Sequence, residues 1–287
     1  ETYFFPMAIV LLLWSVYRAS LKDRWSLLDR AAIVVSLMLA TYSYTIGRLL
    51  GPLLAGGLLL FITSRKRLYS VLSVWAGYAL LLVPLAVYIY ENPAITKRFN
   101  TLSYVDSESP VLSIATQFIA RFAEDVNPVV MLIGGDGNPR HHLPGGQGSF
   151  YFGVFILAAI GIGVVAVLHR RSSWWLYVVF GLLASAVPGA LTNDQFHTLR
   201  MIGYPLFLII LTVPALCWLM GIRPGPPGGV ADPRGEFRWP SLRQSVLTAV
   251  LTLSVVQAGH FFWLYHRDGA DRGEYFDASY KTLFEEA

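Results

Sequence analysis

Apolar runs long enough to cross a membrane recur along the whole chain and are separated by polar segments. A hydrocarbon core about 30 Å thick requires roughly 20 apolar residues in a helix. The pattern predicts about eight transmembrane helices, near residues 2–17, 31–46, 49–63, 71–90, 150–168, 174–191, 202–220 and 245–265. The expected fold class is an all-α polytopic membrane protein, with a large outer loop that contains an interfacial helix.

The second and third apolar runs could also form one tilted helix, because only Arg48 interrupts residues 31–63. A single helix would invert every later loop and place the basic residues 65–67 on the outer side, whereas basic residues concentrate in cytoplasmic loops. We therefore expect a hairpin whose turn, residues 42–48, dips into the outer leaflet.

Composition and charge agree with this topology. Only 14% of the residues are charged, which is low for a soluble domain. The predicted inner loops, residues 18–30, 64–70, 169–173 and 221–244, hold 13 of the 22 basic residues, so both chain ends are expected outside. Because Glu1 is not an initiator methionine and no signal peptide precedes the first run, we expect the chain to be the later part of a longer one.

Four regions follow from these boundaries. They are the first four spans in 1–90, an extracytoplasmic loop in 91–149, the last four spans in 150–266 with a Gly- and Pro-rich cytoplasmic linker in 221–244, and the start of an extracytoplasmic C-terminal segment in 267–287. Within the loop, acids and serines at 106–109 precede Pro110, and apolar residues then recur at helical spacing. This pattern predicts an amphipathic helix along the membrane surface.

The loop ends in a glycine-rich segment that carries several ionisable side chains, namely Asp136, Arg140, His141 and His142. One interpretation is contact with an acceptor or a phosphate, with acid–base help from a histidine that titrates near neutral pH. The alternative is a structural ion pair between Asp136 and Arg140. A metal site is not expected, because adjacent histidines point apart and no cysteine or acid cluster completes the ligands.

Two arginines lie beside the outer ends of predicted spans, Arg48 and Arg200. Arginine can hold a phosphate through two directed hydrogen bonds. Tyr42 and Tyr44 could add hydroxyl donors, and His197 precedes Arg200 by three residues. The alternative is that each arginine reaches lipid headgroups or pairs with a nearby acid.

Three segments together resemble the bacterial protein-mannosyltransferase-like, or aminoarabinose-transferase-like, membrane glycosyltransferases of the GT-C class. They read YSYTIGRLLGPL at 42–53, GDGNPRHHLPGGQGSFY at 135–151 and LTNDQFHTLRMIGYPL at 191–206. The resemblance implies a polyprenyl-phosphate sugar donor that enters from the outer leaflet of a bacterial inner membrane. It also implies a catalytic acid in an N-terminal outer loop that this chain does not show, so no catalytic residue is assigned.

Two other functions were weighed against this glycosyltransferase. An accessory subunit derived from the same fold would lack catalysis and would bind partners in a membrane complex. A secondary transporter is disfavoured, because the predicted spans contain no acid and the two halves show no similar segments. No nucleotide loop, haem motif or iron–sulfur spacing is present, so neither a cofactor nor a nucleic-acid partner is expected.

Overall fold

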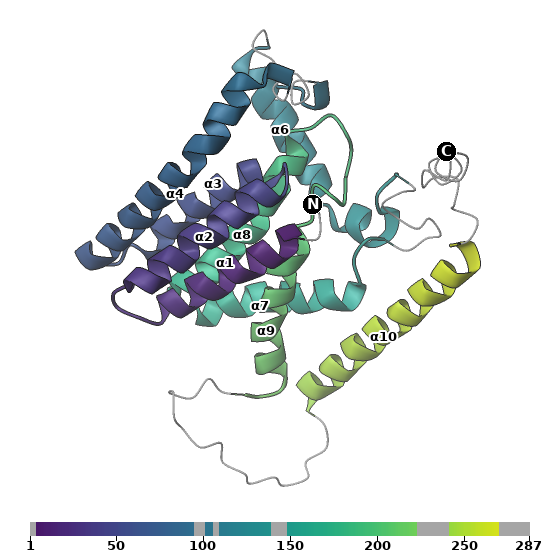
Figure 1. Cartoon of the computed structure of the whole chain (residues 1–287). Coiled ribbons are helices and arrows are strands. Elements are labelled where there is room, and N and C mark those ends of the chain that lie inside the picture. The colour runs from purple at the N-terminus through teal and green to yellow at the C-terminus, as the bar shows by residue number, and fades with distance from the viewer. Residues whose placement is uncertain (1–3, 95–100, 106–108, 139–147, 223–240, 270–287) are drawn as a thin grey trace, which may run out of the picture. The chain divides into compact units, whose positions relative to one another are not determined.

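The computed structural model describes residues 4–94, 101–105, 109–138, 148–222 and 241–269. Over these residues the protein is helical and contains no strand, which confirms the all-α expectation. The chain divides into two compact units (Figure 1). Unit 1 comprises residues 1–130 and 171–207, and unit 2 comprises residues 131–170 and 208–287.

Three helices in the described part of the chain are long and apolar enough to cross a membrane. They are α4 (Arg65–Glu91), α8 (Ser173–Ala190) and α10 (Leu242–Asp268). Shorter apolar helices occupy Phe4–Ser20, Gly47–Phe61, Phe152–Leu168 and Tyr204–Leu219. These elements indicate that the protein associates with a membrane, whereas eight complete spans and their orientation stay a prediction.

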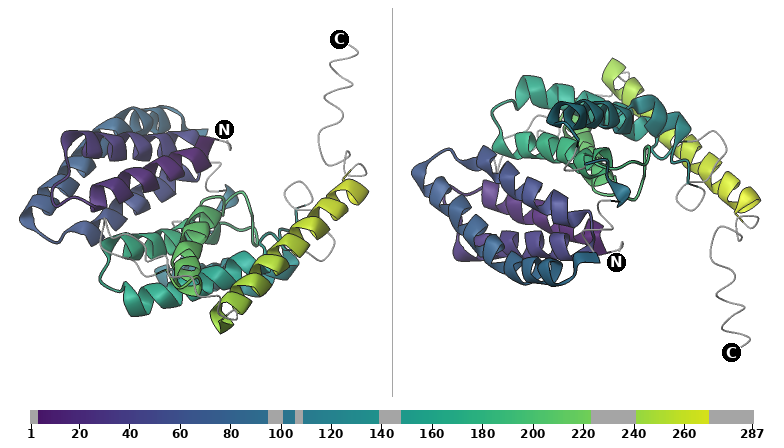
Figure 2. Two further views of the ribbon diagram at one scale, coloured as in Figure 1. Left: turned by 90° about the horizontal axis from the view of Figure 1, so that it is seen from below. Right: turned by 90° about the horizontal axis from the view of Figure 1, so that it is seen from above.

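Unit 1 is a bundle in which α2 (Leu27–Ser43) packs against α1 (Phe4–Ser20), α3 (Gly47–Gly57) and α4, as Figures 1 and 2 show. A short 3₁₀ turn, η1 (Leu58–Phe61), continues α3, and α8 packs against α3. Between α2 and α4, the Thr41 and Tyr78 hydroxyls lie 2.5 Å apart and are hydrogen-bonded. The bundle therefore contains a buried hydrogen bond between two helices in addition to its buried apolar side chains.

The chain turns between α2 and α3, so the segment forms two helices and not one. A Cβ atom on Gly47 would lie only 1.8 Å from the carbonyl oxygen of Ala40, so only glycine fits where the two backbones meet. At the N-terminus of α2, Ser26 and Asp29 form a capping box, and Lys22 donates to the Asp29 carboxylate at 2.6 Å. These contacts fix both ends of α2.

Successive helices of the unit 1 bundle alternate in direction, and aromatic pairs mark the two ends. Phe5 and Tyr44 lie 5.8 Å apart between ring centroids, which joins the start of α1 to the end of α2. Tyr17 and Trp174 lie 5.1 Å apart and join the end of α1 to the start of α8. We call these the Tyr44 end and the Trp174 end.

The predicted loop helix is present as α6 (Val111–Asp125), and it packs against α8 within unit 1. Pro110 occupies the N-cap position with an extended ψ of 137°, one residue before the helix and not inside it. The placement of α6 along a membrane surface stays a prediction.

Unit 2 contains α7 (Phe152–Leu168), α10, a π-helical turn η2 that ends at Gly134, and most of α9 (Tyr204–Leu219). Its core is formed by Leu157, Ala215, Leu219 and Val250. The helices approach closely at glycine, since a Cβ atom on Gly161 would lie 1.7 Å from the carbonyl oxygen of Leu211. The Gln257 side chain accepts a hydrogen bond from the Phe152 backbone N–H at 2.8 Å, which ties α10 to the start of α7.

Candidate functional site

The Tyr44 end of unit 1 carries most of the described polar groups that the sequence singled out. Here a short stretch between α4 and α6, residues 102–105, binds the end of α8 and the chain that follows it. Asn193 donates its backbone N–H to the Leu102 carbonyl at 2.9 Å, and the Ser103 hydroxyl donates to the Leu191 carbonyl at 2.7 Å. The Tyr104 hydroxyl donates to the Ala190 carbonyl at 2.7 Å. These bonds satisfy carbonyls at the C-terminus of α8 and fix the path of the α8–α9 connection.

Asp125, the last residue of α6, is buried against the last turn of α8, next to this connection. The residue is 3% exposed, and its Oδ2 atom makes no hydrogen bond with the described residues. A Cβ atom on Gly189 would lie 2.7 Å from Oδ2, so the carboxyl group packs directly on the α8 backbone. Because Gly189 carries no side chain, the acid can occupy this space.

Burial raises the pKa of Asp125 to about 7. Removal of water from the carboxylate is the largest cause, and the negative charge of Glu124 adds to it. The positive charges of Arg121 and Arg200 lower the pKa but do not cancel the burial. Asp125 therefore changes its protonation state near neutral pH.

Two arginines form polar contacts at the α8–α9 connection. Arg121 reaches it from α6, and Arg200 is part of it. Arg121 donates to Glu124 Oε2 at 3.0 Å and to the Asn193 carbonyl at 3.0 Å. Arg200 is 13% exposed and forms an ion pair with Asp194 at 2.5 Å, and it also donates to the Thr192 hydroxyl. The pairing of Arg200 with a nearby acid corresponds to the structural alternative that the sequence left open.

Arg48 has a different environment at the same end. Its side chain is partly buried at the start of α3, and within the described residues it forms no hydrogen bond or ion pair. Nearby, the exposed Tyr42 donates its hydroxyl hydrogen to the Leu81 carbonyl at 2.7 Å, and Tyr44 packs on Phe5. Arg48 therefore retains its hydrogen-bonding capacity for a ligand.

The structure brings two of the three resemblance segments together. Residues 42–53 and 191–206 meet where Gly203 packs on α3, since a Cβ atom on Gly203 would lie 3.0 Å from Leu50 Cδ2. Within the α8–α9 connection, the His197 carbonyl accepts hydrogen bonds from the backbone N–H groups of Arg200 at 3.0 Å and of Met201 at 3.2 Å. His197 and Arg200 thus share one turn, as their spacing predicts.

The third resemblance segment belongs to unit 2. Asp136 is buried, and its Oδ1 atom accepts a hydrogen bond from the Asn138 backbone N–H at 2.9 Å. Arg140, His141 and His142 lie outside the described residues. The predicted pairing of Asp136 with Arg140 therefore stays a prediction.

Sequence reasoning missed Asp125 and Tyr104, although one signal pointed to Asp125. A carboxylate in the last turn of a helix is unfavourable, because the carbonyl end of the helix is already negative. Asp125 occupies that turn, and such an exception suggests that its environment compensates. Tyr104 gave no comparable signal, because its role depends on α8, which lies more than 80 residues later in the chain.

No three histidine, cysteine or acidic side chains in the described parts of the chain lie close enough together to hold a metal ion. Comparison of the sequence with protein-family models and with curated proteins, and of the fold with solved structures, finds no match. The chemistry of the Tyr44 end is therefore the basis on which a function can be argued.

Proposed function

We propose that this chain forms part of a membrane glycosyltransferase that uses a polyprenyl-phosphate-linked sugar at the outer face of a bacterial inner membrane. In this proposal Arg48 binds the donor phosphate at the Tyr44 end of unit 1. Two observations carry it. Residues 42–53 meet residues 191–206 at Leu50 and Gly203, and the first of these segments holds Arg48, a partly buried arginine with no side-chain partner among the described residues.

The chemistry of Arg48 fits the phosphate of a lipid-linked sugar. A guanidinium group offers five N–H donors and stays positively charged at all physiological pH values. A partly buried cation with no protein acid beside it is stabilised when an anion binds. Such charge-assisted hydrogen bonds contribute about 1.5–3 kcal/mol each.

Arg200 and His197 supply the other side of the proposed donor site. The Arg200 guanidinium is held by Asp194 and Thr192, so it has little freedom to rearrange, and the Asp194 carboxylate balances its charge. Residues 102–104 hold the start of the connection that carries both residues through hydrogen bonds. Asp125 is buried against the last turn of α8, before this connection.

Topology supports the same placement. The alternating helices of unit 1 bring Arg48 and Arg200 to one end of the bundle, and the distribution of basic residues assigns that end to the outer face. The proposal includes about eight spans, with both ends of the chain outside. Contact of Asp136, Arg140, His141 and His142 with an acceptor or a phosphate stays a prediction from the sequence.

The experiment is a binding titration of the purified chain in lipid nanodiscs with undecaprenyl phosphate, followed by native mass spectrometry. Arg48→Gln should weaken binding about 10- to 100-fold, which corresponds to the loss of one charge-assisted interaction. Arg65→Gln is the matched control, because Arg65 is exposed at the opposite end of unit 1. Binding no tighter than that of phosphatidylglycerol, or equal loss in both variants, would contradict the proposal and favour a non-catalytic accessory subunit.

A further inference from the structure

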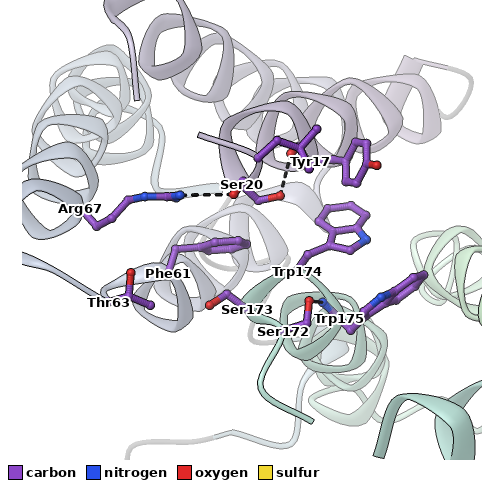
Figure 3. A pocket seen from close by; sticks show the side chains of 10 residues that line it. Tyr17, Ser20, Phe61, Thr63, Arg67, Ser172, Ser173, Trp174 and Trp175 are labelled. Carbon is purple, nitrogen blue, oxygen red and sulfur yellow. Dashed lines mark hydrogen bonds between the residues drawn. The ribbon is translucent and has the colours of Figure 1, made fainter. Parts of the chain in front are cut away.

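The Trp174 end of unit 1 contains a cavity of about 400 Å³ that the proposed transfer reaction does not use. Figure 3 shows its lining, in which Arg67 lies across the cavity from Tyr17 and Trp174, and serine and threonine hydroxyl groups lie among the aromatic rings. The lining comes from the end of α1, the η1–α4 connection and the first residues of α8.

Arg67 provides the fixed positive charge of the polar side. The residue is 8% exposed, and its guanidinium group donates to carbonyls at the end of α1. Nε donates to Asp23 at 3.0 Å, and Nη2 donates to Ser20 at 3.2 Å and also to Lys22. Within the described residues Nη1 makes no hydrogen bond, so one donor group of an otherwise fixed guanidinium remains for a ligand.

The N-terminus of α8 lies in the same lining. Ser172 caps the helix by accepting from the Trp175 N–H at 3.5 Å, whereas the N–H groups of Ser173 and Trp174 have no partner inside the helix. An 18-residue helix also places a partial positive charge at this end. The two features, a buried arginine and a helix N-terminus, both favour an anion, and phosphate binds well at such helix ends.

The opposite side of the cavity is aromatic. Tyr17 packs edge-on against Trp174, and Phe61, which is almost fully buried, adds a ring to the lining on the side of Arg67. Tryptophan and tyrosine side chains concentrate where a membrane meets water, because their rings are apolar and their N–H or O–H groups are polar. A ligand that fills this cavity should therefore have a phosphate and an apolar body.

We propose that this cavity binds the phosphate of an anionic phospholipid headgroup at the cytoplasmic face, with its glycerol and upper acyl carbons against the aromatic side. Basic residues that adjoin the lining in the sequence, Arg18, Lys66 and Arg171, are exposed and attract the anionic leaflet. This site is at the opposite end of unit 1 from Arg48. It stands independently of the proposed sugar donor.

The test measures the phospholipid that the purified full chain retains, by native mass spectrometry after release from nanodiscs that contain equal amounts of phosphatidylglycerol and phosphatidylcholine. The wild-type chain should retain phosphatidylglycerol about tenfold in preference to phosphatidylcholine, as expected for a charge-assisted contact. Addition of millimolar inorganic phosphate should not displace it. Displacement by inorganic phosphate would overturn the lipid assignment and identify a free phosphate as the ligand.

Ser173→Glu is the decisive variant, because Ser173 is the first residue of α8. A glutamate there is favourable for the helix, yet its carboxylate would occupy the anion position and repel a phosphate. We expect the preference for phosphatidylglycerol to disappear. Leu242→Glu is the matched control, since it adds the same charge to the first turn of the capped helix α10. Equal preference in the wild type and in Ser173→Glu, or equal loss in both variants, would overturn the proposal.

Discussion

Asp125 should make the stability of the protein depend on pH in a way that Asp125→Asn abolishes. The native structure raises the pKa of this carboxyl group from 3.8 to about 7, chiefly through burial. Between these two values the native state keeps its proton and the unfolded state has lost it. The free energy of unfolding is therefore highest below pH 3.8 and falls as the pH rises to about 7.

The magnitude follows from the size of the shift. Each pKa unit corresponds to about 1.4 kcal/mol, so the change from 3.8 to about 7 corresponds to up to about 4 kcal/mol. Asparagine has nearly the shape of the protonated acid but never carries a charge. At pH 8 Asp125→Asn should therefore raise the free energy of unfolding by up to about 4 kcal/mol, and at pH 4 it should have little effect.

The assay is denaturant unfolding in detergent micelles from pH 4 to pH 8, followed by tryptophan fluorescence. Asp268→Asn is the control, because Asp268 forms an exposed ion pair with Arg267. The reasoning is refuted if the wild type and Asp125→Asn lose stability in parallel with rising pH. It is also refuted if Asp125→Asn destabilises the protein equally at pH 4 and pH 8.

Two further substitutions test the packing of unit 1. Gly47→Ala places a methyl group 1.8 Å from the Ala40 carbonyl oxygen and should destabilise the protein by about 2 kcal/mol or more, whereas Gly56→Ala, in open space on the same helix, should be neutral or stabilising. Thermal unfolding of both variants checks this, and equal melting temperatures would contradict it. Tyr104→Phe removes the 2.7 Å hydrogen bond to the Ala190 carbonyl and should cost about 1 kcal/mol, with faster hydrogen exchange in the α8–α9 connection. Unchanged exchange there would show that Tyr104 does not hold the connection.

The helices could be predicted from the sequence because their signals are local. The hairpin at residues 42–48 was predicted because a single helix would place the basic residues 65–67 on the outer side, and the structure ends α2 at Ser43 and begins α3 at Gly47. The helix bounds differ mainly at polar ends: α4 begins at Arg65, six residues before the predicted span, because Ser64 caps it with a hydrogen bond to the Arg67 N–H. Polar residues in the first turn of a helix belong to the helix, but a search for apolar runs does not include them.

The site could be predicted only in part, since its chemistry depends on contacts between distant segments. The spacing of His197 and Arg200 was sufficient to place them in one turn. The sequence allowed Arg200 either to pair with a nearby acid or to stay free. The path of the α8–α9 connection decides between the two, because it brings Asp194 to Arg200. The burial of Asp125 depends on a glycine at position 189 of another helix, which no local pattern reveals.

Photo-cross-linking with a polyprenyl phosphate that carries a diazirine near its phosphate tests the central claim most directly. The chain is cross-linked in nanodiscs and digested, and the modified peptides are identified by mass spectrometry. Our account predicts that labelling concentrates in residues 42–53 and 191–206, and that Arg48→Gln reduces it while Arg65→Gln does not. Labelling spread evenly along the lipid-facing helices, unchanged by Arg48→Gln, would contradict a donor site at the Tyr44 end.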